Sequence, residues 1–192
     1  VLGSDADANL LDGLCELLTS IQESAGVVKV RKAILAKQEQ RFGAESKEEG
    51  VALWYLGNAY GGRGEKAKVR DVLERALPIV EREHGSGSTE VADVLNNLSN
   101  AYGDLGDQAK KRDMLERALA IQERTYGRDH AEVAITLSNL GFAYNALDEP
   151  AKARERLERA LAIQERAYGR DHTEVAKTLT NLGVAYGELG DN

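Results

Sequence analysis

The sequence predicts an all-α protein, a superhelix of stacked antiparallel helix pairs, from three observations. Segments recur at a spacing of 42 residues: LERALAIQERTYGRDHAEVA (115–134) returns as LERALAIQERAYGRDHTEVA (157–176). Each unit holds two stretches with apolar residues at helical spacing. Two prolines, 42% hydrophobic and 30% charged residues favour long helices with a polar outer face. Because one helix pair cannot bury its apolar stripe alone, the units must stack.

The repeat extends over nearly the whole chain and predicts its division. Earlier copies read LERALPIVEREHGSGSTEVA (73–92) and, more faintly, RKAILAKQEQRFGAESKEEG (31–50). A degenerate copy, LLDGLCELLTSIQES, lies at 10–24. We therefore expect a degenerate N-terminal helix pair that caps the array at 1–47, full repeats at 48–89, 90–131 and 132–173, and the first helix of an incomplete repeat at 174–192. The chain starts with Val, which indicates a fragment or a processed chain.

The unit at 132–173 shows how each helix pair is built. Apolar residues of the first helix share one face: Val133, Leu137, Leu140, Gly141, Tyr144 and Leu147. The second helix has its own inward face: Ala153, Leu157, Ala160, Leu161 and Tyr168. Its outer face carries charges four residues apart, which predicts the pairs Arg154–Glu158 and Glu155–Arg159.

Turn residues mark the end of each first helix. Gly64, Gly106 and Gly190 stand where a left-handed residue closes the last turn. Asp148 holds that place in the third full repeat, and we expect it to adopt positive φ, which Asp tolerates better than most residues. Pro150 then suits the first turn of the second helix.

The pentapeptide YGRDH, at 126–130 and 168–172, combines residue types found in acid/base and metal sites. We interpret it as the joint between repeats. Gly127 and Gly169 end one helix, while Asp129 and Asp171 precede a Glu by three residues, the arrangement of a capping box. The equivalent loop at 85–89 reads GSGST, which keeps the Gly but has no Arg, Asp or His.

No residue pattern predicts catalysis, a cofactor or a metal. His130 and His172 lie one repeat apart and do not converge, whereas zinc needs three or four ligands around one point. Cys15 lies in a Leu-rich helical pattern and is expected to be a small buried hydrophobe. We therefore expect a non-enzymatic protein.

Composition and charge argue against some classes of partner and location. The formal charge is −7, which argues against nucleic acid and anionic membrane surfaces. No apolar run reaches the length of a membrane span, so no membrane insertion is expected. A single cysteine cannot form an internal disulfide, so a cytoplasmic location is the expectation.

The spacing of Leu140, Gly141, Tyr144, Ala153 and Ala160 resembles the signature of the tetratricopeptide repeat. The common form of that repeat has 34 residues. The longer unit here is similar to the variety found in kinesin light chains and nephrocystin-type proteins. This resemblance implies a right-handed α-solenoid whose first helices line a concave groove, and such grooves commonly hold a peptide.

Helical spacing assigns nine residues to that concave face: Trp54, Tyr55, Asn58, Asn97, Asn100, Ile135, Asn139, Phe142 and Asn181. Asn97, Asn139 and Asn181 form a ladder with one amide per repeat. An amide both donates and accepts, so the ladder can pair with a peptide backbone, and the aromatic residues can supply anchors. The alternative is that these side chains pack between repeats and tie them together.

Two functions follow from these patterns. The first is an adaptor that binds a peptide segment or a partner protein in its groove. The second is a structural subunit, or the repeat tail of a larger signalling or multi-subunit protein, without a dedicated groove. In that case a second copy could cover the open C-terminal end. Acidic residues on the same face argue against a clamp for a peptide's C-terminal carboxylate: Asp93, Asp104 and Glu188.

Overall fold

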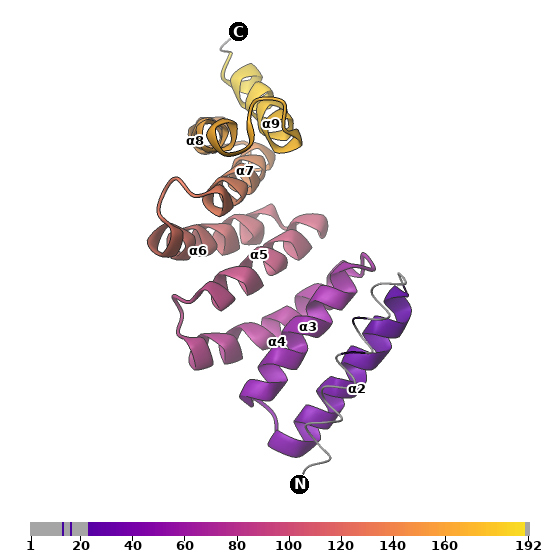
Figure 1. Ribbon diagram of the computed structural model, residues 1–192. Helices are drawn as coiled ribbons and strands as arrows, with labels where there is room; N and C mark the ends of the chain where they lie inside the picture. Colours follow the sequence, from indigo (N-terminus) through magenta and orange to yellow (C-terminus); the bar gives the residue numbers. More distant parts are fainter. Residues whose placement is uncertain (1–12, 14–15, 17–22, 191–192) are drawn as a thin grey trace. The chain divides into compact units, whose positions relative to one another are not determined.

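The computed structural model describes Gly13, Glu16 and residues 23–190, where helices α2 to α9 lie (Figure 1). Their bounds are α2 Ser24–Phe42, α3 Lys47–Gly61, α4 Lys66–His84, α5 Thr89–Asp104, α6 Gln108–Tyr126, α7 Ala131–Ala146, α8 Pro150–Tyr168 and α9 Thr173–Leu189. No strand occurs in this part of the chain, which confirms the all-α class. Most of the first half of the predicted pair at 1–47, including Cys15, lies outside the described residues.

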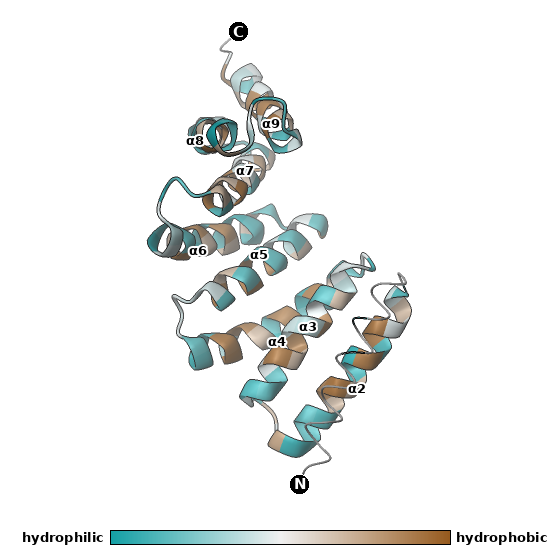
Figure 2. Cartoon of the chain, in the orientation of Figure 1, coloured by the Kyte–Doolittle hydropathy of each residue, from teal (hydrophilic) through white to brown (hydrophobic). Residues whose placement is uncertain are grey.

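The chain forms two compact units, residues 1–86 and 87–192. In the first unit α2 packs on α3, and α3 packs on α4. In the second, each helix from α5 to α9 packs on the next, and α7 also contacts α9. Apolar and polar residues share every helix, as the mixed colours in Figure 2 show. Each helix can therefore bury one side and expose the other.

The predicted inward faces form the core of the second unit. Leu137, Leu140 and Tyr144 of α7 are buried against α8, where Leu157 is fully buried. Gly141 makes this contact close, because a Cβ there would lie 2.3 Å from Cγ of Leu157. Full burial of one Leu side chain stabilises the folded state by about 1.5–3 kcal/mol. A larger residue at position 141 would displace Leu157 and reduce this contribution.

The turn predictions are confirmed at Asp148 and Pro150. Asp148 has φ 59°, in the left-handed region, and Pro150 is the first residue of α8. The glycines at the equivalent turns also have positive φ: Gly64, Gly106 and Gly190. On the outer face, the Arg154–Glu158 pair is present at 4.0 Å.

The predicted Glu155–Arg159 pair is wrong. The guanidinium of Arg159 instead contacts the carboxylate of Glu123 on α6 and donates to the backbone carbonyl of Arg128 at 2.6 Å. Arg159 thus connects α8 with the preceding repeat. Helical spacing predicts only neighbours on the same helix. Arg159 instead pairs with a carboxylate on another helix, Glu123 of α6.

Candidate functional site

The YGRDH segments are joints between helices, but their capping residue is not the predicted one. His130 precedes α7, and its Nδ1 accepts a hydrogen bond from the backbone N–H of Glu132 at 3.2 Å. The prediction that Asp129 caps the helix is therefore wrong. After Gly127 the chain turns through 128–129, and His130 is the extended residue (φ −77°, ψ 149°) from which the helix starts. The same correction holds one repeat later, for Asp171, His172 and Glu174.

The tyrosines of these segments stack on the same histidines. The ring centroids are 4.9 Å apart for Tyr126 and His130, and 4.6 Å apart for Tyr168 and His172. Tyr168 is thus exposed at the joint, and its predicted place on the inward face of α8 is wrong. Within the described ranges, no three His, Cys, Asp or Glu side chains lie close enough to hold a metal ion.

In the first unit, the predicted site residues lie on α3. Tyr55 and Asn58 line a pocket of about 310 Å³ between α3 and the start of α2, and the guanidinium carbon of Arg31 lies 4.6 Å from the centre of the Tyr55 ring. Trp54 stacks on Tyr55, with ring centroids 6.1 Å apart. The structure therefore brings together Tyr55 and Asn58, with Trp54 beside them.

In the second unit, the asparagine ladder occupies the same position on three helices. Asn97 of α5, Asn139 of α7 and Asn181 of α9 are all partly exposed. In the part of the chain that the structure describes, the side-chain amides of Asn139 and Asn181 form no hydrogen bond. Both amides can therefore donate to and accept from a ligand. Asn100 is exposed on α5 as well.

The predicted apolar residues of this face differ in exposure. Phe142 is 44% exposed, whereas Ile135 is half-buried. The ammonium of Lys111, on α6, lies 4.7 Å from the centre of the Phe142 ring, a cation–π contact. Phe142 is thus an exposed aromatic with a cation beside it, which suits an anchor position.

Lys111 itself was missed, although the sequence contains a signal for it. It occupies the repeat position that Ala153 holds one repeat later. Its side chain is 8% exposed and crosses Gly103, where an added Cβ would lie 2.7 Å from the lysine Cδ. Burial lowers the pKa of Lys111, and the charge of Asp104 opposes this effect. A long cation at a position that holds alanine one repeat later signals an unusual contact, but it does not identify the partner.

A buried polar network between repeats was also missed. Thr178 of α9 donates to Gln164 of α8 at 2.7 Å, and its hydroxyl lies 2.8 Å from that of Ser138 on α7. Gln164 also donates to Ser138 at 3.0 Å. One repeat earlier, Thr136 donates to Gln122 at 2.7 Å. The glutamine recurs in the AIQER segments, but only the structure shows that both copies are buried.

Part of the face therefore ties repeats together, as the alternative interpretation proposed. Besides Ser138, the side-chain amide of Asn145 on α7 donates to the backbone carbonyl of Asn181 on α9 at 2.8 Å. Neither Ser138 nor Asn145 belongs to the nine predicted site residues. The face thus contains both structural contacts and amides that remain accessible.

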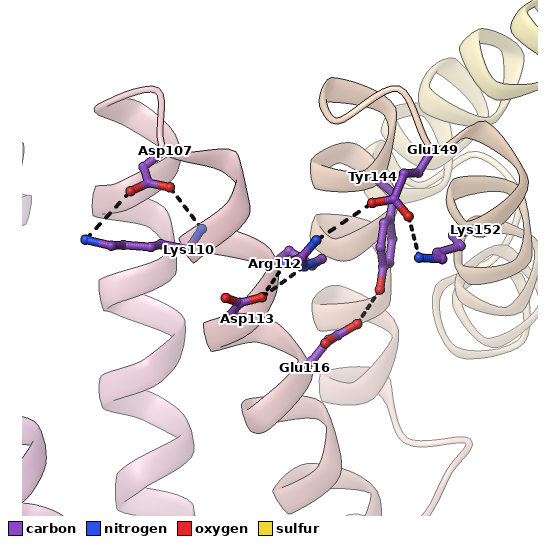
Figure 3. Close-up of polar contacts among 8 residues, drawn as sticks. All are labelled: Asp107, Lys110, Arg112, Asp113, Glu116, Tyr144, Glu149 and Lys152. Carbon is purple, nitrogen blue, oxygen red and sulfur yellow. Dashed lines mark hydrogen bonds and ion pairs between the residues drawn. The ribbon is translucent and has the colours of Figure 1, made fainter.

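A second set of polar contacts joins α6 to α7 and to the turn that precedes α8 (Figure 3). The hydroxyl of Tyr144 donates to Glu116, and burial together with this bond raises the pKa of Tyr144 to about 12. Arg112 bonds Asp113 and lies 3.7 Å from Glu149. The tyrosine hydroxyl thus lies in a cluster of charged side chains in which carboxylates outnumber cations.

Comparison with protein families gives one match, which covers three overlapping stretches. The model of the tetratricopeptide repeat matches residues 48–124, 91–166 and 132–192. The comparison with curated proteins found no match. No helix in the described ranges is long and apolar enough to cross a membrane.

Solved structures with the same fold include several repeat proteins. A putative kinesin light chain from Podosopora anserina, with nearly identical repeats, is 21% identical with a TM-score of 0.80, over 99% of this chain and 90% of that one. BtubC (BKLC) from P. vanneervenii is 24% identical with a TM-score of 0.79, over 97% and 74%. The first repeat domain of Spaghetti (RPAP3), bound to the HSP90 peptide SRMEEVD, is 18% identical with a TM-score of 0.55, over 76% and 96%.

Proposed function

The chain belongs to the tetratricopeptide repeat family, and from this premise we propose that it is a non-enzymatic scaffold that binds a peptide segment or partner protein. Binding takes place on the first-helix face of the second unit, formed by α5, α7 and α9. The observation that carries this proposal is the pair of accessible amides at Asn139 and Asn181, at equivalent positions of successive repeats.

The mechanism uses backbone recognition together with an aromatic anchor. Each amide can accept from one peptide N–H and donate to one carbonyl, which holds a backbone irrespective of its sequence. Phe142, exposed on the same helix as Asn139, supplies apolar contact area. Lys111 adds a positive charge at its ring. A solved domain of the same fold, the first repeat domain of Spaghetti (RPAP3), is bound to a peptide, which supports a peptide as the kind of partner.

The test is capture of partners from the native lysate by the wild-type chain and by a triple variant, Asn97→Ala, Asn139→Ala and Asn181→Ala. Each lost hydrogen bond contributes about 0.5–1.5 kcal/mol, so we expect recovery of a specific partner to fall about tenfold or more. The matched control changes exposed acidic residues of the second helices, one per repeat: Asp71→Ala, Asp113→Ala and Glu155→Ala.

Circular dichroism of both variants should show unchanged helicity. Equal capture by the triple variant and the wild type would remove this face from the proposal. Equal loss in the control variant would do the same, because it would show that any change of surface polarity weakens capture.

A structural role is the second candidate, favoured by the uncovered side of α9. Leu179 and Val184 are 48% and 46% exposed, and no atom of the described residues lies within 4 Å of a Cβ placed on Gly183. Leu182 of the same helix is buried at 6% exposure. A second copy covering α9 would give a concentration-dependent dimer in light scattering. A strict monomer at high concentration contradicts self-association.

The remaining expectations stay part of this proposal. We place the repeats at 48–89, 90–131 and 132–173, with a capping pair at 1–47 and a further first helix at 174–192. The location is cytoplasmic, no cofactor takes part, and the partner is a protein rather than nucleic acid. A formal charge of −7 supports the last point.

A further inference from the structure

The second unit repeats one arrangement around its inward-facing tyrosines. Tyr144 donates to Glu116 on the preceding helix, and Tyr186 donates to Glu158 in the same way at 2.6 Å. The carboxylate lies 28 residues before the tyrosine in both cases. On the helix that carries it, the neighbouring outward residues combine one cation with acids: Arg112, Asp113 and Glu116, and one repeat later Arg154, Glu155 and Glu158.

The first unit keeps the tyrosine but reverses the charges around it. The residue 28 positions before Tyr60 is Lys32 instead of Glu. Counting back by the 42-residue repeat, Lys29 replaces an acid and Val28 replaces an arginine. Arg63 likewise stands where the later repeats have leucines: Leu105, Leu147 and Leu189. Three positions have thus gained positive charge in a chain that is acidic as a whole.

These changes meet in one pocket of about 280 Å³, here called the Tyr60 pocket. Helix α2 contributes Ala25, Val28, Lys29 and Lys32, α3 contributes Tyr60, and the turn to α4 with its first residues contributes Arg63, Glu65 and Lys68. The ammonium groups of Lys32 and Lys68 lie 5.8 and 5.4 Å from the centre of the Tyr60 ring. The pocket therefore has an aromatic floor with cations on two walls.

Among the described residues, Glu65 is the one carboxylate that lines the Tyr60 pocket, and it is already engaged. Glu65 binds both Arg63 and Lys68, which lowers its own pKa and raises that of Lys68. On the opposite wall, no carboxylate of the described residues forms an ion pair with Lys29 or Lys32. In the described part of the chain, four cations thus face one carboxylate in this pocket, and that carboxylate pairs with Arg63 and Lys68 rather than with the lysines of α2.

The spacing of the α2 lysines favours one compact anion over separate ones. Residues three apart on a helix are neighbours on one face, so both ammonium groups can reach the same ligand. A phosphoryl group carries about −1.5 to −2 charge at neutral pH and three acceptor oxygens. A carboxylate carries less charge and fewer oxygens. We propose that the Tyr60 pocket binds a phosphoryl group on a side chain of a partner protein.

The test is an NMR titration of the ¹⁵N-labelled chain with the capped peptide Gly-phosphoserine-Gly. Separate titrations use Gly-Ser-Gly, Gly-Glu-Gly and inorganic phosphate. We expect amide shifts confined to residues 25–32 and 60–68, and binding of the phosphoserine peptide about tenfold tighter than that of the glutamate peptide. No shifts are expected with the serine peptide.

The informative variant is Lys29→Asp combined with Lys32→Glu, which introduces the residue types that this chain carries at the same positions in α6. It therefore has a folded precedent within the molecule, and we expect about a tenfold or greater loss of affinity. The control, Lys47→Glu with Arg170→Glu, changes two exposed cations elsewhere by the same charge.

Three results would overturn the proposal. Equal loss in the variant and the control would mean unspecific attraction to the whole surface. A glutamate peptide that binds as tightly as the phosphoserine peptide would make the Tyr60 pocket a site for acidic segments. If free phosphate binds more tightly than the phosphoserine peptide, the phosphoryl group that the pocket recognises is not one carried by a protein side chain. The site is separate from the asparagine ladder, so its failure leaves the proposed function untouched.

Discussion

The buried pair of Thr136 and Gln122 gives a sharp test of how the repeats are held together. Both side chains are nearly inaccessible, at 1% and 3% exposure, and the threonine hydroxyl donates to the glutamine Oε1 at 2.7 Å. Thr136→Val keeps the shape of the side chain but removes this donor. Leaving a buried acceptor without its partner costs about 1–3 kcal/mol. We therefore expect the free energy of unfolding to fall by that amount.

The double variant Gln122→Leu with Thr136→Val separates the hydrogen bond from simple packing. Removing both polar partners and keeping the volume is often nearly neutral, so the double variant should be more stable than Thr136→Val alone. The chain has a precedent, because the equivalent positions one repeat earlier are Val80 and Val94. Thr180→Val is the control, since that exposed hydroxyl bonds only its own helix, at Ala176.

The assay is urea unfolding followed by circular dichroism. It compares the wild type with the single variants Thr136→Val and Gln122→Leu, the double variant and the control Thr180→Val. We expect the control to stay within about 0.5 kcal/mol of the wild type. Two results would refute the reasoning. One is a Thr136→Val variant as stable as the control. The other is a double variant that loses the sum of both single changes, because independent sites add whereas bonded partners do not.

Three further predictions concern the turns and the buried tyrosine. Gly127 has φ 87° and ψ 158°, a region essentially restricted to glycine, so Gly127→Ala should lower the free energy of unfolding by about 1–3 kcal/mol. Asp148 has φ 59°, which glycine adopts without strain, so Asp148→Gly should raise the free energy of unfolding by up to about 1 kcal/mol. Thermal unfolding measures both changes. A Gly127→Ala protein with unchanged stability would contradict this reading of the turn. The pKa of Tyr144 is raised to about 12, so the phenol keeps its proton to higher pH in the folded state than in the unfolded state. The contribution of Tyr144 to folding stability is therefore present below about pH 10 and is lost as the pH rises to 12. Tyr144→Phe should therefore unfold less steeply with alkali than the wild type, and equal pH profiles would refute it.

Local patterns in the sequence predicted the helices and their inward faces because both depend on near neighbours. The apolar spacing that placed Leu137 and Tyr144 on one face arises from the helical period itself. Asp148 could be assigned a positive φ because its three counterparts are glycines. In a repeated sequence, each residue can be compared with those at the equivalent positions of the other repeats. A domain without repeats does not allow this comparison.

The capping residue could not be assigned with the same certainty, for a reason of backbone geometry. A cap is the residue at which the chain leaves extended conformation, and the turn after Gly127 moves that point from Asp129 to His130. A shift of one residue changes which side chain faces the free N–H groups. Sequence spacing alone allowed both.

The candidate site shows the same division between sequence and structure. Helical spacing placed Asn139 and Phe142 on an accessible face, and both are accessible. It did not show that Lys111 reaches Phe142 from the adjacent helix, since that contact requires the stem to cross Gly103. Partners on other helices depend on packing distances that no periodicity contains.

The sequence by itself therefore determined the repeat, the helices, their buried faces and the exposed amides, because each follows from local spacing. Only the tertiary structure decided the role of the residues that depart from the repeat pattern, such as Lys29 and Lys32. Lys29 and Lys32 are ordinary lysines in a helical pattern until α2 is placed against Tyr60 and Lys68, where their charges share one pocket. Electrostatic sites arise from distances between helices, and those distances exist only after the helices have packed.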